Sequence, residues 1–230
     1  MKTYLLLLTL ICVQATFGQF AIISDKDGFA NVRKSNEIGN NIIDTLTNGQ
    51  IVFCLEEMNG WRPVDYVKNG KELSGYVHDS RLFYIDNFKS IKYRSLTKDS
   101  VIFSHDSISL TVIKEPFIAN KNKLKYKKIG DKTNESMFLA KINGKQIWGT
   151  DGEIPKYQYQ KILLKIGNKV INLPCKNMYE PTLKYTKVNV DSKTNTIYIT
   201  ADNSDGAGGY TVLWIVTNEI FKRKIITIPF

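Results

Sequence analysis

The chain has 230 residues, of which 43% are hydrophobic and 11% aromatic, and its formal net charge is +10. This composition supplies enough apolar side chains for a buried core and differs from that of a disordered polymer. Two histidines and three cysteines are too few for a His/Cys-rich metal site. The motifs G-x-x-x-x-G-K-S/T, G-x-G-x-x-G and G-x-S-x-G do not occur, so the usual signals for nucleotide binding and serine hydrolysis are missing. We therefore expect no metal and no cofactor.

The first 18 residues have the pattern of a secretory signal. Lys2 precedes an apolar run over residues 4–13, and the small residues Ala15 and Gly18 follow it. The run has roughly half the length of a bilayer-spanning helix. We therefore expect an exported protein, periplasmic or extracellular, with cleavage after Gly18 and no membrane span.

Residues 20–86 consist of short apolar runs separated by turn dipeptides. Asp-Gly and Asn-Gly pairs, spaced by roughly 8–12 residues, favour tight turns between antiparallel strands. This pattern predicts a small antiparallel β-barrel. The runs are AII (21–23), FANV (29–32), IIDTL (42–46), IVFCL (51–55), WRPV (61–64) and GYVHDSRLFYI (75–85).

Three segments of this region carry a more specific pattern. They are DKDGFANVR (25–33), TNGQIVFCLEEMNGWRPVDY (47–66) and GYVHDSR (75–81). An NVR strand, a GxxV strand, an NGWxxV strand and a closing GYV strand, in this order, resemble the bacterial SH3-like domain. The resemblance implies a small non-catalytic barrel over residues 19–86, of a kind that is usually attached to a larger exported protein and often binds cell-wall peptide or glycan. Many wall-binding members have Trp where this chain has Tyr76.

Arg33, Trp61 and Tyr76 are the candidate ligand-binding residues of the predicted barrel. The rings of Trp61 and Tyr76 can stack on a sugar or a peptide, and Arg33 can meet an acidic ligand. A structural interpretation stands beside this one. Both rings would then be core or half-buried aromatics, and Arg33 would pair with a neighbouring carboxylate.

From residue 87 onwards the apolar runs lengthen and predict an antiparallel β-sandwich of roughly eight strands over residues 87–230. The Lys/Asn-rich stretch 120–135 is expected to be a loop, and the domain boundary is expected near residues 86–90. The fold class is therefore all-β, an SH3-like β-barrel followed by a sandwich. The candidate strands are 101–113, 137–142, 145–149, 159–166, 169–173, 187–190, 196–201, 210–216 and 224–230.

Charge is divided unevenly between the two predicted domains. Residues 19–86 hold 7 basic and 10 acidic residues (net −3), whereas residues 87–230 hold 24 basic and 12 acidic residues (net +12). An excess of this size favours encounter with an acidic protein partner, although a solvated lysine-rich surface explains it equally. Because 22 of the 24 basic residues are lysine, bidentate recognition of nucleic acid is not expected.

Two loop segments of the second domain contain side chains that could carry chemistry. Asp151 and Glu153 lie beside Trp148 in IWGTDGEIPKY (147–157), and Asp202 and Asp205 lie in DNSDGAGGY. Paired carboxylates can act as general acid and base or hold calcium. Neither segment has the spacing of a calcium loop, and Asx turns explain both.

Cys54 and Cys175 would reach a compartment that permits disulfides, so they are either two buried thiols or a bridge between the two halves. A cysteine peptidase would need a histidine as base. His78 and His105 both precede Cys175, the reverse of the order in the cell-wall cysteine peptidases that often carry SH3-like domains. We therefore expect that the protein is not an enzyme.

The sequence favours an exported, non-enzymatic binding protein whose SH3-like module recognises a cell-envelope peptide or glycan. One alternative is an immunity or inhibitor protein that neutralises an exported toxin or hydrolase. The other is a cell-wall hydrolase whose active site has no recognisable motif.

Overall fold

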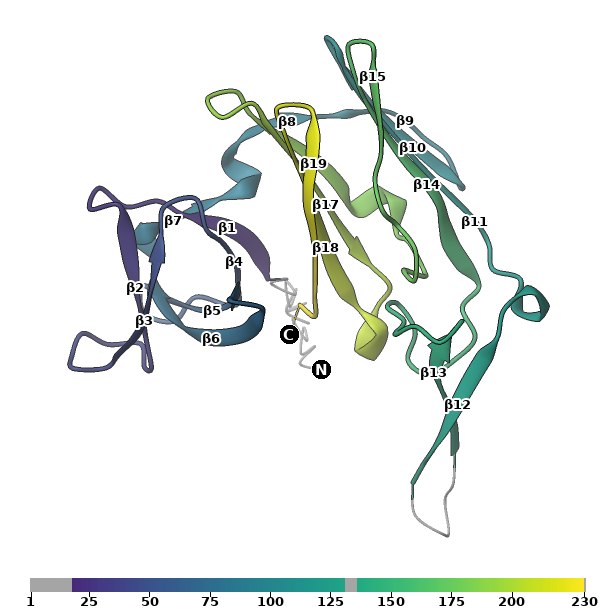
Figure 1. The fold of residues 1–230 in the computed structure, drawn as a ribbon, viewed down its shortest axis with the longest axis horizontal. Helices are drawn as coiled ribbons and strands as arrows, with labels where there is room; N and C mark the ends of the chain where they lie inside the picture. The colour runs from purple at the N-terminus through teal and green to yellow at the C-terminus, as the bar shows by residue number, and fades with distance from the viewer. Residues whose placement is uncertain (1–17, 131–135, 230) are drawn as a thin grey trace, which may run out of the picture.

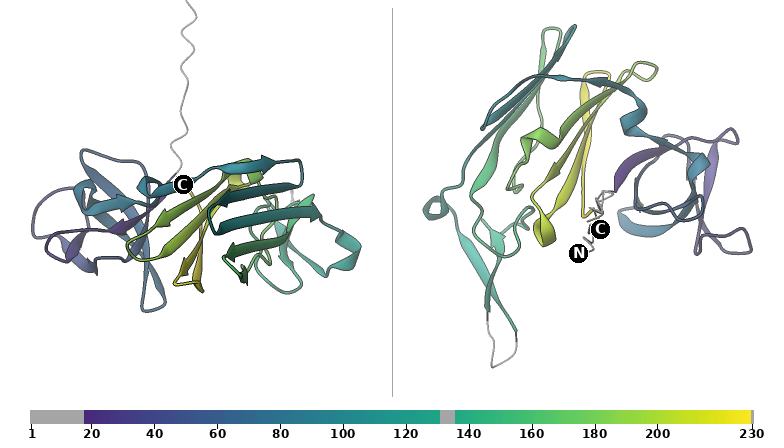
Figure 2. Two further views of the ribbon diagram at one scale, coloured as in Figure 1. Left: turned by 90° about the horizontal axis from the view of Figure 1, so that it is seen from above. Right: turned by 180° about the vertical axis from the view of Figure 1, so that it is seen from behind.

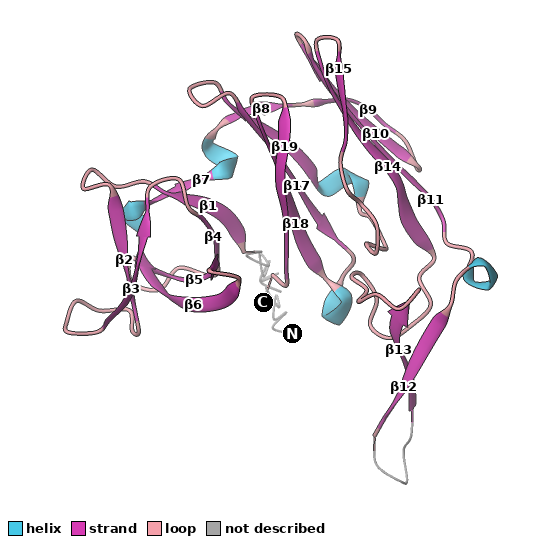
Figure 3. Cartoon of the chain, in the orientation of Figure 1, coloured by secondary structure: helices cyan, strands magenta, loops and turns pink. Residues whose placement is uncertain are grey.

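The structure, a computed structural model, describes residues 18–130 and 136–229 (Figure 1). The expected signal segment, residues 1–18, lies outside the described part except for its last residue. Strands dominate the described chain, and its helices are five short 3-10 turns (Figure 3). The prediction of an all-β fold is confirmed. The turns are η1 (Asp79–Arg81), η2 (Ile85–Asn87), η3 (Ala119–Lys121), η4 (Leu183–Tyr185) and η5 (Gly206–Gly208).

The first seven strands form one antiparallel sheet that curls into a half-barrel, in the order β3-β2-β6-β5-β4-β1-β7 (Figure 1). Asn69 and Gly70 have positive φ, 53° and 74°, and make the tight turn that an Asn-Gly pair predicts. Side chains at alternate positions, such as Ala30, Val32 and Val77, fill the inside of the half-barrel. The strands are β1 (Gln19–Ile23), β2 (Phe29–Arg33), β3 (Ile42–Thr47), β4 (Ile51–Cys54), β5 (Trp61–Lys68), β6 (Lys71–His78) and β7 (Leu82–Tyr84).

The following strands form a β-sandwich of two five-stranded sheets. The central sheet has the order β19-β18-β17-β16-β8, and the outer sheet has the order β15-β14-β11-β10-β9. Leu110 and Ile162 of the outer sheet share one core with Ile199 and Val212 of the central sheet. The strands are β8 (Lys89–Ile91), β9 (Tyr93–Leu96), β10 (Ser100–His105), β11 (Ile108–Pro116), β14 (Tyr157–Ile166), β15 (Lys169–Asn172), β16 (Thr186–Asp191), β17 (Thr196–Asn203), β18 (Tyr210–Thr217) and β19 (Ile220–Thr227).

A separate two-stranded hairpin, β12 (Leu124–Ile129) and β13 (Ser136–Ile142), extends from the sandwich (Figures 1 and 2). The expectation of a loop over residues 120–135 is therefore wrong for the part that forms β12. Alternating lysines and apolar residues in β12 suit a ribbon that is exposed on both faces, and this pattern resembles a loop when it is judged by composition alone.

Several other strand boundaries differ from the predicted ones. The run 101–113 is a hairpin of β10 and β11, because Asp106 adopts a φ of 50° at its turn. The run 145–149 forms only isolated bridges and no strand. The last strand begins at Ile220, because Asn218 and Glu219 make a turn with positive φ at both residues and without a glycine. The sandwich thus has ten strands.

The central sheet is covered on both faces. Val212 and Trp214 of β18 point into the sandwich core, whereas Leu213 and Ile215 face Phe20 of the half-barrel. Both faces of β18 are consequently apolar, which explains its uninterrupted hydrophobic run. The half-barrel, central sheet and outer sheet form three successive layers (Figures 1 and 2).

Phe53→Ala should lower the free energy of unfolding by about 3–5 kcal/mol, because this ring is 2% exposed at the contact between half-barrel and central sheet. Phe29→Ala is the matched control and should cost less than about 1 kcal/mol, since its ring is 43% exposed. Urea unfolding followed by circular dichroism measures both. Equal losses in the two variants would show that the contact contributes nothing specific.

Candidate functional site

Trp61 is a structural residue of the half-barrel. Its ring is 8% exposed and lies edge-on to the ring of His78, with 5.1 Å between the centroids. The Arg33 guanidinium carbon lies 5.7 Å from the Trp61 ring centroid, a distance that suits a cation–π contact. The side chains of His78 and Arg33 thus fill the space beside the Trp61 ring in which a ligand would have to stack. This supports the structural interpretation of Trp61.

Arg33 holds the loop that follows β2. Its Nη1 donates to the carbonyl oxygen of Gly39 at 2.8 Å and to Oδ1 of Asn41 at 2.7 Å. The expected carboxylate partner is replaced by these two neutral oxygens. Tyr76 is half-buried and pairs with Arg33 across β2 and β6. The structure therefore brings the Arg33 side chain against Trp61 and places Tyr76 opposite Arg33 on the neighbouring strand.

The two predicted loop segments of the sandwich contact each other through Gly149 and Ser204. Gly149 has a φ of 106° and lies against the backbone of Tyr179. A side chain at position 149 would place its Cβ atom 2.2 Å from the carbonyl oxygen of Tyr179. Ser204 Oγ donates to the Gly149 carbonyl oxygen at 2.9 Å, so the 147–157 segment is tied to the loop after β17. Trp148 packs against Tyr210, with 6.4 Å between ring centroids.

The carboxylates of these loops do not converge. Asp151 and Asp205 are exposed, whereas Asp202 is partly buried and accepts a hydrogen bond from Thr211 Oγ1 at 2.7 Å. Burial raises the pKa of Asp202. Nowhere in the described residues do three His, Cys, Asp or Glu side chains gather in a way that could hold a metal ion.

The two described cysteines are free thiols in different cores. Cys54 is inside the half-barrel, where burial raises the pKa of its thiol to about 12, and Cys175 packs against the sandwich core. His78 bonds to Ser80 Oγ through Nδ1, and His105 lies beside Asp106. Neither described histidine hydrogen-bonds to a thiol.

A cleft of about 650 Å³ lies between the half-barrel and the central sheet. β4 pairs with β5 only where Phe53 faces Asp65 and Cys54 faces Val64. Beyond these pairs β5 leaves β4 and continues along β6, which opens the wall of the half-barrel toward β19. The lining residues are Phe20, Ile51, Val52, Phe53, Asp65, Tyr66, Val67, Glu72, Leu73, Ser74, Trp148 and residues 223–228.

The edge of β19 borders this cleft. All residues from 223 to 228 line it, and neighbouring side chains of a strand point to opposite faces. The cleft therefore follows the edge of the strand and not one of its faces. β19 is the last strand of the central sheet, so its outer edge presents backbone N–H and C=O groups that the sheet leaves unpaired.

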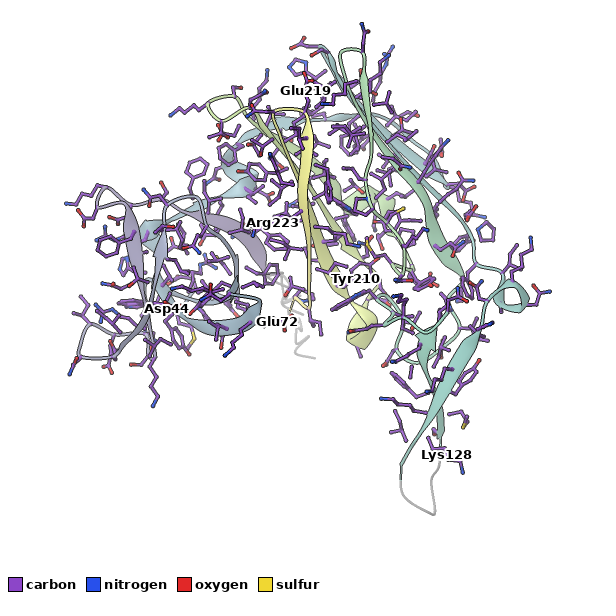
Figure 4. The ribbon with its side chains drawn as sticks, in the orientation of Figure 1. Asp44, Glu72, Lys128, Tyr210, Glu219 and Arg223 are labelled. Carbon is purple, nitrogen blue, oxygen red and sulfur yellow. The ribbon has the colours of Figure 1, made fainter. Side chains whose placement is uncertain are left out.

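Charged side chains of opposite sign stand on the two walls. Asp65 and Glu72 belong to the half-barrel and Arg223 belongs to β19, and Figure 4 shows Glu72 and Arg223 on either side of the gap. Burial, together with the nearby charge of Glu72, raises the pKa of Asp65, and partial burial lowers that of Arg223. Among the described residues none of these three side chains takes part in an ion pair within 4.0 Å.

No motif or spacing in the sequence predicts this cleft. Of the predicted candidates, Trp148 alone is found among the described residues that line it. Asp65 and Arg223 lie far apart in the chain, and neither belongs to a motif. A signal existed in β18, whose apolar residues on both faces imply that another layer covers the sheet.

Comparisons with protein-family models, with curated proteins and with solved structures find no match for this chain. The resemblance of residues 20–86 to the bacterial SH3-like domain therefore stays a prediction based on the sequence pattern. Among the residues that the structure describes, no helix has the length and apolar character needed to cross a membrane.

Trp61→Ala should cost about 3–5 kcal/mol of stability, because it removes a large buried ring. Trp61→Phe should recover most of this loss, since it keeps an apolar ring at the site. Thermal and urea unfolding measure both variants. A loss below about 1 kcal/mol, accompanied by weaker ligand binding, would instead assign Trp61 to a binding surface.

Asp65→Asn should stabilise the protein more at neutral pH than in acid. The raised pKa of Asp65 means that folding favours its protonated form, so the cost of the buried charge is absent below the ordinary value of 3.8 and grows as pH rises above it. Urea unfolding across this pH range compares the variant with the native protein. Asp99→Asn, at an exposed carboxylate, is the control, and an equal pH dependence in both variants would contradict the burial of Asp65.

Proposed function

We propose that the protein is an exported, non-enzymatic binding protein that captures a short extended peptide of the cell envelope in the cleft between half-barrel and central sheet. The observation that carries the proposal is the pair of opposite charges, Asp65 and Arg223, on facing walls without ion-pair partners among the described residues. Asp65 is half-buried, and a half-buried charge without a partner is costly, whereas Arg223 is exposed. A ligand that brings an ammonium to Asp65 and a carboxylate to Arg223 would remove this cost.

The shape of the cleft supports an extended peptide. Its volume of about 650 Å³ lies within the usual range of ligand sites, and such sites often occur between domains. An extended peptide that adds to the edge of β19 would pair its backbone with the strand. The apolar side chains of Ile51 and Ile225, which line the cleft and are only half-buried, would pack against peptide side chains. Export and the cell-envelope origin of the peptide rest on the signal-like N-terminus and on the SH3-like sequence pattern.

Calorimetric titration with peptidoglycan stem peptides, which carry both ammonium and carboxylate groups, tests the proposal. We expect saturable binding that Arg223→Gln weakens by about tenfold or more, because a hydrogen bond between charged groups contributes about 1.5–3 kcal/mol. Asp65→Asn should weaken binding similarly. Arg94→Gln, at an exposed arginine of β9, is the matched control and should leave binding unchanged.

Two results would overturn this function. One is the absence of binding, or binding that Arg223→Gln and Arg94→Gln affect equally. The other is cleavage of the peptide, detected by mass spectrometry after incubation, which would contradict a non-enzymatic role.

A further inference from the structure

The hairpin of β12 and β13, with the residues next to it, forms a projecting arm. We define the basic arm as residues 121–130 and 136–145. It belongs to neither five-stranded sheet and extends away from the sandwich (Figures 1 and 2). Its base is held by Leu139 and Ile142, which are fully buried and pack with Tyr179. The part beyond this anchor has solvent on both faces.

Positive charge is concentrated on the basic arm. Its described residues include seven lysines, all exposed, and no acidic residue. With residues 131–135 counted from the sequence, residues 121–145 hold eight lysines and two acidic residues, a net +6. This segment alone accounts for half of the net +12 of residues 87–230. The seven lysines are Lys121, Lys123, Lys125, Lys127, Lys128, Lys141 and Lys145.

Apolar side chains are exposed among these lysines. Tyr126 is 37% exposed, Ile129 is 49% exposed and Met137 is 61% exposed. Ile129 and Met137 belong to the outer part of the ribbon, as does Lys128, which Figure 4 shows far from the body of the molecule. One face of the ribbon carries Lys125, Lys127 and Ile129, and the opposite face carries Tyr126, Lys128 and Met137, so each face presents cationic and apolar groups together.

The kinds of side chain indicate which anionic partner fits. The cores of protein–protein interfaces are poor in lysine and rich in arginine, and base recognition in DNA relies on the planar fork of arginine. The basic arm has lysine and no arginine. Compact ammonium charges with exposed apolar neighbours suit the headgroup region of an anionic lipid bilayer, where the charges attract and the apolar side chains enter the acyl boundary.

We propose that the basic arm binds the surface of an anionic phospholipid bilayer through the face of the ribbon that carries Lys125, Lys127 and Ile129, with the lysines at the headgroups and Ile129 inserted below them. This inference is independent of the peptide-binding cleft, which lies on the other side of the central sheet from the outer sheet. An acidic protein, which charge alone would also attract, is the competing partner that the experiment must separate.

Sedimentation of the signal-free protein with vesicles tests the arm. We expect binding to phosphatidylglycerol/phosphatidylcholine vesicles, little binding to pure phosphatidylcholine, and weaker binding as salt increases. Lys125→Gln/Lys127→Gln should weaken binding by roughly tenfold or more. The matched control, Lys161→Gln/Lys165→Gln, removes the same charge from exposed positions of β14 and should change binding only slightly.

A second variant separates insertion from attraction by charge alone. Ile129→Ser leaves the net charge unchanged and should still weaken vesicle binding, while circular dichroism shows an intact fold. Equal losses in the two lysine variants, or unchanged binding in the serine variant, would overturn the proposal. So would the absence of vesicle binding, whether or not an acidic protein binds. Arg223→Gln should leave vesicle binding intact, so failure of the cleft and failure of the arm are distinguishable.

Discussion

The central sheet is buried on both faces, by the half-barrel on one side and by the outer sheet on the other. Leu213 and Trp214 are neighbours in β18, yet one is buried against the half-barrel and the other in the sandwich core. Removing both faces of a strand from water stabilises the three layers together, because the hydrophobic effect scales with the apolar area that is buried. The half-barrel and the sandwich are thus held in one arrangement by a shared apolar contact.

This arrangement creates the cleft. The half-barrel contacts the central sheet through Phe20 and Phe53, and the divergence of β5 from β4 leaves space beside the contact. The edge of β19 and the charged residues Asp65 and Arg223 are thereby placed around that space. Neither module contains the cleft by itself, since each contributes one wall. A rigid apolar contact beside an open, charged space is an arrangement that many binding sites between domains share.

Two kinds of electrostatics operate in this molecule. In the cleft, the carboxylate of Asp65 is half-buried, so its interactions act over a short range and depend on the geometry of the ligand. On the basic arm, exposed lysines act as a diffuse positive field that salt screens. The half-barrel is net acidic and the arm is strongly basic, so the chain carries its opposite charges at separate places. The recognition that we propose for the cleft and the attachment that we propose for the arm therefore rest on separate groups of charges.

The all-β fold, most strands and the turn at Asn69 could be predicted from the sequence, because strand alternation and turn conformation depend on residues that are close in the chain. The resemblance to an SH3-like domain also came from local pattern. The tertiary structure alone decided that Trp61 is packed between Arg33 and His78, and that Asp65 and Arg223 face one cleft. It also decided that a lysine-rich stretch is a projecting ribbon. These features depend on contacts between strands that are distant in the chain, and such contacts leave no periodic signal in a single sequence.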